Sequence, residues 1–244
     1  MHSDTIFNDL WILNTTDMNW RVVAPTSSHN SVQPPGLVGH TATAYASGTS
    51  SSSSVADSGS GGNKVNPSAA TTTTIFYIGG VSSCTQQSCG GSRSLWQNAV
   101  WALDTATTQW TNVQTEPAST LKGTVAFPAR QGHSAVLVGS KILVYGGFAD
   151  VDSDVNADNR VYQLHLSNNW PQVDRTLRWT ILNATGVGPR AHTGNIALML
   201  EQRFFVIYNG RTSSAKRGTD AEFASMVVSS QEERLEWKNS RQRS

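Results

Sequence analysis

The sequence has few cysteines, almost no excess of charge and no long hydrophobic run. Two of its 244 residues are cysteines, and 18 basic against 17 acidic residues leave a formal net charge of +1. Nucleic acids and anionic membrane surfaces attract proteins that carry a basic excess, so we expect neither as a partner. The chain has no run of about 18 apolar residues that could cross a bilayer, and its start lacks the basic and then apolar layout of a signal peptide. We therefore expect no direct membrane insertion by this segment.

The two cysteines, Cys84 and Cys89, lie close together in a Ser/Gly-rich stretch. A disulfide between them would close one small loop, and two cysteines are too few for a metal site of their own. Asn14 and Asn183 each begin an Asn-x-Thr glycosylation pattern, which has meaning in a secreted protein. These features favour an extracellular or lumenal setting over a cytoplasmic one. The alternative is that both patterns arise by chance and both cysteines are reduced.

Two segments repeat one pattern of strand, turn and strand. One runs from Asn8 to Trp20 and the other from Asn98 to Trp110. In each, an apolar strand that contains a tryptophan leads into a polar turn, and a second tryptophan opens the next strand. This pattern predicts a β-hairpin in both places.

A second unit occurs three times along the chain. In its clearest copy, Gly132–Val138 and Lys141–Gly147 are apolar strands joined by a Gly-Ser turn. The other copies are Gly39–Tyr45 with Ile75–Gly80, and Ala191–Ala197 with Phe204–Gly210. Each copy carries a histidine in its first strand. Three copies in a regular order predict a repeat architecture.

Joined in order, the two units give a module of four strands: a histidine strand, a glycine-rich strand and the two strands of the hairpin. Pro128-Ala129-Arg130 or Gly188-Pro189-Arg190 leads into the histidine, and this order resembles the kelch repeat. The resemblance covers nearly the whole chain. It implies an all-β fold, a kelch-type β-propeller of the galactose oxidase-like superfamily with four-stranded antiparallel blades. It implies little about function, because such propellers serve many roles.

The repeats divide the chain into a half blade followed by three blades. The expected boundaries are 4–23 for the half blade and 36–114, 129–182 and 189–240 for the blades. The first blade contains a Ser/Thr/Gly-rich insert, residues 46–74, that we expect to be disordered.

The last blade is the weakest match to the repeat. Residues 223–228 and 235–237 are expected to form its third and fourth strands, and a helix over 220–240 is the alternative. The total of about 3.5 blades is an incomplete ring, because propellers close with four to eight. Two copies would reach seven by count, but each brings the same outer half blade, so we do not expect a simple dimer to complete the ring.

Loops are the expected binding surface, because repeat scaffolds meet their partners through insertions. Residues 81–97 and 148–158 link second to third strands, and they should emerge on the same face as the connection at 115–127. We expect a protein partner on that face. Arg130 and Arg190 are expected to make hydrogen bonds between blades, and the alternative for both is to hold an acidic peptide.

Aromatic and histidine residues that recur once per blade are expected to be structural, since such positions satisfy the same buried contacts each time. They are Trp11, Trp20, Trp101, Trp110, Trp179, His40, His133 and His192.

An acidic loop has the alternating carboxylates of a calcium site. Its members are Asp150, Asp152, Asp154, Asn156 and Asp158. Calcium is not expected, because Val155 and Val161 stand where the calcium motif requires glycine and glutamate. We interpret the loop as solvated and its first three aspartates as candidate partner contacts.

The expected function is a non-catalytic protein-protein interaction module or scaffold with no cofactor, because no catalytic motif occurs. The alternative that the resemblance implies is a radical copper oxidase, whose site needs two tyrosines, two histidines and a cysteine crosslinked to a tyrosine. Neither Cys84 nor Cys89 has a tyrosine near it in the sequence. A third hypothesis is a non-functional fragment of a longer protein.

Overall fold

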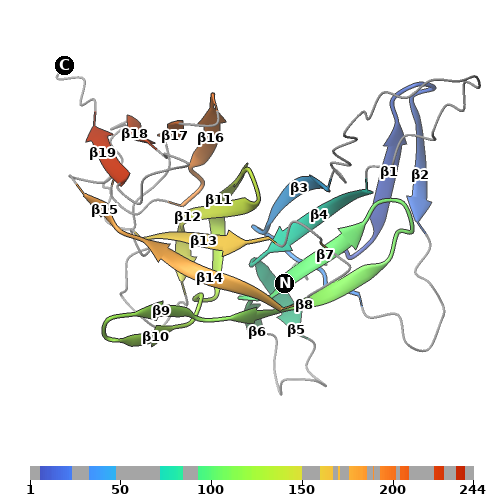
Figure 1. Ribbon diagram of the computed structural model, residues 1–244. Helices are drawn as coiled ribbons and strands as arrows, with labels where there is room; N and C mark the ends of the chain where they lie inside the picture. The colour runs from blue at the N-terminus through green and yellow to red at the C-terminus, as the bar shows by residue number, and fades with distance from the viewer. Residues whose placement is uncertain are drawn as a thin grey trace, which may run out of the picture.

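The computed structural model shows a chain built from β-strands (Figure 1). It describes residues 6–23, 33–47, 72–84, 93–149, 160–166, 170, 176–185, 189, 193–201, 204–208, 223–227 and 235–239. Within these ranges no helix occurs. The prediction of an all-β fold with four-stranded antiparallel blades is confirmed.

Three blades follow one another along the chain, each pairing its strands antiparallel in sequence order. Blade I consists of β3 (Thr41–Ser47), β4 (Thr72–Ile78), β7 (Val100–Asp104) and β8 (Trp110–Glu116). Blade II consists of β11 (Arg130–Val138), β12 (Lys141–Ala149), β13 (Val161–His165) and β14 (Thr176–Leu182). Blade III consists of β16 (Ile196–Leu200), β17 (Phe204–Tyr208), β18 (Phe223–Val227) and β19 (Leu235–Asn239).

A hairpin precedes the blades. It is formed by β1 (Leu10–Asn14) and β2 (Asn19–Val23), which make a sheet of their own among the described strands. Blade III has strands at β18 and β19, where a helix was the alternative. Most of the insert expected to be disordered lies outside the described residues, as do parts of the loops at 81–97 and 148–158.

The central blade is buried on both faces. Side chains of β12 alternate, so that Ile142 and Val144 pack toward blade I while Leu143 and Tyr145 pack toward blade III. This explains the continuous apolar run of β12, because a strand covered on both sides has no polar face.

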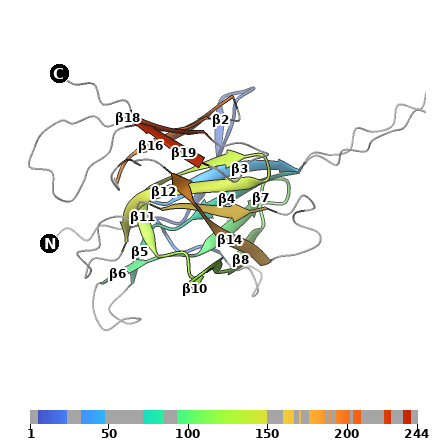
Figure 2. The same ribbon diagram turned by 60° about the vertical axis from the view of Figure 1, so that its left-hand side comes forward.

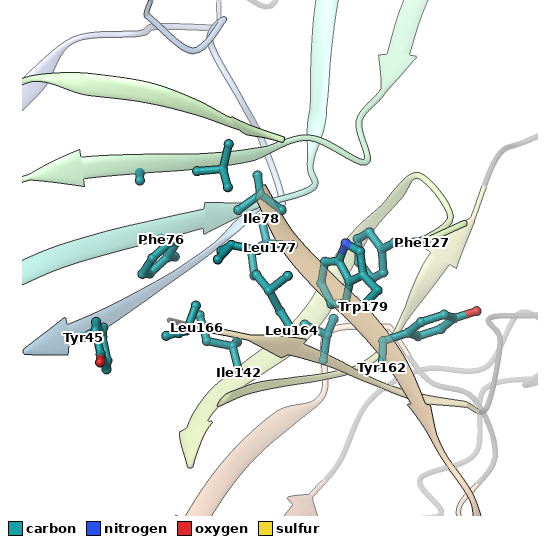
Figure 3. Close-up of a cluster of buried hydrophobic side chains, with 14 of the residues drawn as sticks. Tyr45, Phe76, Ile78, Phe127, Ile142, Tyr162, Leu164, Leu166, Leu177 and Trp179 are labelled. Atoms are coloured by element: carbon teal, nitrogen blue, oxygen red, sulfur yellow. The ribbon is translucent and has the colours of Figure 1, made fainter. Parts of the chain in front are cut away.

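The core between blades I and II is rich in aromatic side chains. Figure 3 shows Phe76 and Ile78 of β4 facing Leu164 and Trp179 of blade II. Phe127, which precedes β11, stacks on Trp179 with ring centroids 4.1 Å apart and planes 5° from parallel. The blades are therefore held together by apolar and aromatic contacts of the kind that dominate protein cores.

A row of glycines links the inner ends of the three blades. The N–H of Gly132 donates to the carbonyl of Gly39 over 2.8 Å, and the N–H of Gly194 donates to the carbonyl of Gly132 over 2.8 Å. All three glycines have φ between 64° and 69°, a conformation that glycine adopts without steric cost. One backbone hydrogen bond of the same kind therefore joins each blade to the next.

This row corrects the alignment of the third repeat. The sequence pattern matched Ala191-His192 to Gly132-His133, but Gly194 occupies the structural position of Gly132. Asn195 consequently takes the place that His133 has in blade II. The position of Gly132 requires a residue with positive φ. In the third repeat the glycine that meets this requirement comes two residues after the histidine, so the Pro-Arg and His pattern gave the wrong alignment. His192 itself lies outside the described residues.

The outer strands are also linked from blade to blade. The end of β8 pairs in parallel with β14, from Gln114 opposite Thr176 to Glu116 opposite Arg178. Likewise β15 (Ala184–Thr185), which follows β14, pairs in parallel with β19. Each blade thus extends one short strand onto its successor.

The five recurring tryptophans differ in burial, and Trp110 is partly buried. Trp101 and Trp179 are buried, as expected for structural residues. Trp11 and Trp20 on the β1–β2 hairpin are 53% and 63% exposed. In the described part of the chain no blade covers these two side chains, so the structural role expected for them stays a prediction.

Candidate interaction surface

The repeat histidines sit in tight surroundings at the inner ends of the blades. His133 is buried, and its Nε2 shares a 3.0 Å hydrogen bond with Oγ1 of Thr41 on the preceding blade. Burial lowers the pKa of His133 to about 3, and the positive charge of Arg130 and then that of His40 add to the effect. Burial also lowers the pKa of His40. The neutral, buried imidazole of His133 thus serves as a structural link between blades I and II.

The next step around the ring uses the same link in another form. Oγ of Ser134, at the position of Thr41, donates to the backbone carbonyl of Asn195 over 2.5 Å. Tyr145 adds a second bond, because its Oη donates to the carbonyl of Pro189 over 2.9 Å. Both bonds are buried and join blade II to the start of blade III.

Arg130, a candidate for partner binding, is 1% exposed. Its Nη1 donates to the carbonyl of Gly146 over 2.8 Å, and its guanidinium lies 5.0 Å from the ring centroid of Phe127 and 4.8 Å from that of Tyr162. A buried cation needs hydrogen bonds and aromatic faces of this kind. The side chain therefore acts inside blade II and does not reach the surface.

Two short hairpins project from the blades. The first consists of β5 (Val81–Cys84) and β6 (Arg93–Trp96), and the second of β9 (Ala118–Thr120) and β10 (Gly123–Val125). Both lie on the lower side of the blades in Figures 1 and 2. They occupy parts of the segments 81–97 and 115–127, which the sequence indicated only as loops. Short tertiary-stabilised hairpins of this kind have no periodicity that a sequence could reveal.

The β9–β10 hairpin has a buried base and an exposed tip. Ala118 at its start is fully buried in the core between blades I and II. At the tip, Oγ1 of Thr120 donates to the carbonyl of Gly123 over 2.8 Å. Leu121 projects fully into solvent. The hairpin backbone is thus anchored at its base and presents a large apolar side chain away from the core.

The β5–β6 hairpin is anchored in the same manner. The backbone of Val81 makes two 2.9 Å hydrogen bonds with that of Val38, and Nε2 of Gln97 donates to Oγ of Ser82 over 3.0 Å. Leu95 on β6 is exposed. The β5–β6 hairpin, which carries this second exposed leucine, lies on the same lower side as the β9–β10 hairpin.

Several predicted site residues lie outside the described residues. They are Asp150, Asp152, Asp154, Arg190, Cys89 and the side chain of Cys84. Asn14 and Asn183 are exposed, and Oδ1 of Asn14 accepts a hydrogen bond from the N–H of Thr16. The disulfide, the two glycosylations and the acidic loop therefore stay predictions.

Neither a metal cluster nor a spanning helix is found in the part of the chain that the structure describes. There, no three side chains of His, Cys, Asp or Glu gather as metal ligands. No helix of the described ranges is long and apolar enough to cross a membrane.

Comparison with known proteins matches most of this chain to one family. A family model described as the KLHDC2/KLHL20/DRC7 Kelch-repeats domain matches residues 68–243. Tip elongation aberrant protein 1 of Schizosaccharomyces pombe is 28% identical over 137 residues, which are 56% of this chain and 10% of that protein. Rho GTPase-activating protein gacHH of Dictyostelium discoideum is 28% identical over 89 residues, 35% of this chain and 5% of that protein. The chain thus spans a tenth or less of the length of either relative.

Proposed function

Because this chain belongs to the Kelch-repeat family, whose domains are interaction modules, we propose that it is a non-catalytic segment that binds a protein partner. The partner meets the side of the blades from which the β5–β6 and β9–β10 hairpins project. The observation that carries this proposal is the pair of exposed leucines, Leu95 and Leu121, held on hairpins with buried bases.

Apolar side chains on anchored hairpins suit this role. Ordering a flexible loop on binding opposes association, whereas an anchored hairpin backbone avoids that loss of entropy. Interfaces are dominated by a few apolar or aromatic anchors that enter pockets of the partner. We infer a partner with apolar pockets that receive the two leucines. Nucleic acid is not the proposed partner, since the net charge of +1 provides no basic surface.

The test compares proteins captured from an extract of the source cells by the native chain and by a Leu95→Asp, Leu121→Asp double variant. We expect a partner whose binding weakens about tenfold or more in the variant, the usual effect of losing an interface anchor. Both side chains are exposed, so circular dichroism should show an intact fold.

The matched control is Met18→Asp, which changes an exposed apolar residue on the turn of the β1–β2 hairpin. Figure 1 shows that turn on the opposite side of the molecule from the two projecting hairpins. The control should bind like the native chain. Captured proteins that bind the double variant and the native chain equally well would contradict the proposal.

A further inference from the structure

A row of basic side chains crosses three strands of blade II. Lys141 of β12 is paired with His165 of β13, and His165 is paired with Arg178 of β14. Directly paired residues point to the same side of a sheet. Lys141 lies two residues from Leu143, so this side is the one on which Leu143 packs toward blade III. Lys141 is exposed and 68% of the Arg178 side chain is open to solvent, so the row lies at the rim of that apolar contact.

The row is specific to blade II. The strand pairing gives the corresponding residues of the other two blades. They are Thr74, Asp104 and Gln109 in blade I, and Phe204, Val227 and Glu236 in blade III. None of these six residues is basic. A structural role that all blades share therefore does not account for the row.

Two polar neighbours hold the histidine of the row. Gln163 is 5% exposed, and its Nε2 lies 2.8 Å from Nε2 of His165. Oγ1 of Thr180 lies 2.8 Å from the same ring nitrogen. Because an amide nitrogen only donates, Nε2 of the neutral ring accepts and the ring proton is on Nδ1. Among the described residues this Nδ1–H has no hydrogen-bond partner, so it is available to a ligand.

The surroundings of His165 carry positive charge. Burial lowers the pKa of its ring, and the charges of Lys141 and then of Arg178 lower it further. Glu116 of β8 is the acid beside the row, where its Oε2 accepts from Nε of Arg178 over 3.0 Å and lies 2.9 Å from Nη2. Nη1 of Arg178 and the ammonium of Lys141 have no carboxylate partner in the part of the chain that the structure describes. Two cations and a ring N–H are thus balanced by a single acid.

We propose that the row formed by Lys141, His165 and Arg178 binds a small oxyanion, namely a phosphate or sulfate group. Neighbouring strands lie about 4.8 Å apart, so the backbone places His165 midway between two cations about 10 Å apart. A tetrahedral anion above the ring accepts from Nδ1 of His165, from Nζ of Lys141 and from Nη1 of Arg178. Hydrogen bonds in which donor and acceptor carry opposite charge are the short, strong ones.

The site is small and belongs to one blade. Its three donors come from neighbouring strands of blade II, and the row is only one anion wide. It therefore suits a single anionic group, whereas a nucleic acid needs cations along many phosphates. The site shares no residue with the β5–β6 and β9–β10 hairpins, so it goes beyond the proposed binding of a protein partner.

The experiment follows the ring signals of His165 by NMR while sodium phosphate replaces sodium chloride at constant ionic strength and pH 7. The variant His165→Gln identifies these signals. We expect saturable binding in the millimolar range, and a rise of about one unit in the pKa of His165, because an anion favours the charged ring. Lys141→Ala and Arg178→Gln should each weaken binding about tenfold. Glu116→Gln should strengthen it about threefold, because the carboxylate that competes for Arg178 is gone.

The matched control is Lys122→Ala, which removes an exposed lysine from the β9–β10 hairpin and should leave phosphate binding unchanged. The peptide Gly-phosphoserine-Gly distinguishes two sources of the group. Tighter binding of the peptide than of inorganic phosphate assigns the group to a protein partner, and equal or weaker binding assigns it to a free anion. Signals that do not saturate, or native affinity in Lys141→Ala, would overturn the proposal. The Leu95→Asp, Leu121→Asp variant should bind phosphate like the native chain, so this test is separate from capture of a partner by the hairpins.

Discussion

The buried imidazole of His133 makes the contact between blades I and II sensitive to pH. It lies where blades I and II meet, bonded to Thr41, with Arg130 close enough to disfavour a second positive charge. Its folded pKa of about 3 is far below the ordinary 6.5. The folded chain therefore keeps this side chain neutral through most of the acidic range.

This predicts a loss of stability in acid. Below pH 6.5 the unfolded chain binds a proton at His133 that the folded chain does not bind until about pH 3, so the free energy of unfolding falls across that window. By pH 4 the contribution lost is about 3 kcal/mol. Lowered pKa values at His40 and His165 act in the same direction. Urea unfolding at a series of pH values measures the effect.

The matched variant is His133→Asn, because Asn195 holds the equivalent position in blade III. Without the titrating ring, the slope of unfolding free energy against pH should be shallower by up to about 1.4 kcal/mol per pH unit between pH 6 and 4. Equal slopes for the native chain and the variant would show that His133 does not titrate as described.

The roles of some single residues could be predicted from the sequence, and those of others could not. The repeated His40 and His133 could be recognised as structural from their spacing alone. The third copy could not be aligned correctly from the sequence. An alignment by histidine places His192 opposite His133, whereas the fold places Gly194 at the position of Gly132. Nothing in a sequence states which glycine has positive φ.

Among the elements, β12 depends on a glycine pair within a long strand. Gly147 has φ of 85°, and a Cβ there would lie 2.6 Å from the carbonyl oxygen of Gln131 and 2.9 Å from the Cβ of His133. The neighbouring strand β11 thus approaches too closely for any side chain. This explains why β12 carries a glycine at position 147.

We expect Gly147→Ala to destabilise the fold by about 2–4 kcal/mol, from backbone strain together with the clash against β11. Gly139→Ala is the matched control, since Gly139 also has positive φ but has open space around it. The control should cost about 1 kcal/mol, from the backbone alone. Urea unfolding compares the two variants. An equal loss of unfolding free energy in both would mean that the close approach to β11 does not contribute to the cost of Gly147→Ala.

Strands of the repeat were predictable from sequence, whereas the two projecting hairpins were not. The strands carry apolar runs and turn residues that recur from blade to blade. The β5–β6 and β9–β10 hairpins occur once each and are fixed by distant contacts, such as Val81 with Val38 and the burial of Ala118. Most of the proposed binding surface therefore became visible only with the fold.

The bonds from Gly194 to Gly132 and from Gly132 to Gly39 connect neighbours and bypass no blade. The same holds for the parallel outer strands and for the two apolar clusters. The energetics are therefore those of a linear series with nearest-neighbour coupling. A destabilising change in one blade lowers the stability of the adjacent blades most, and its effect decreases with distance along the series. Among these three blades, blade II contacts a blade on each side, so it should unfold last.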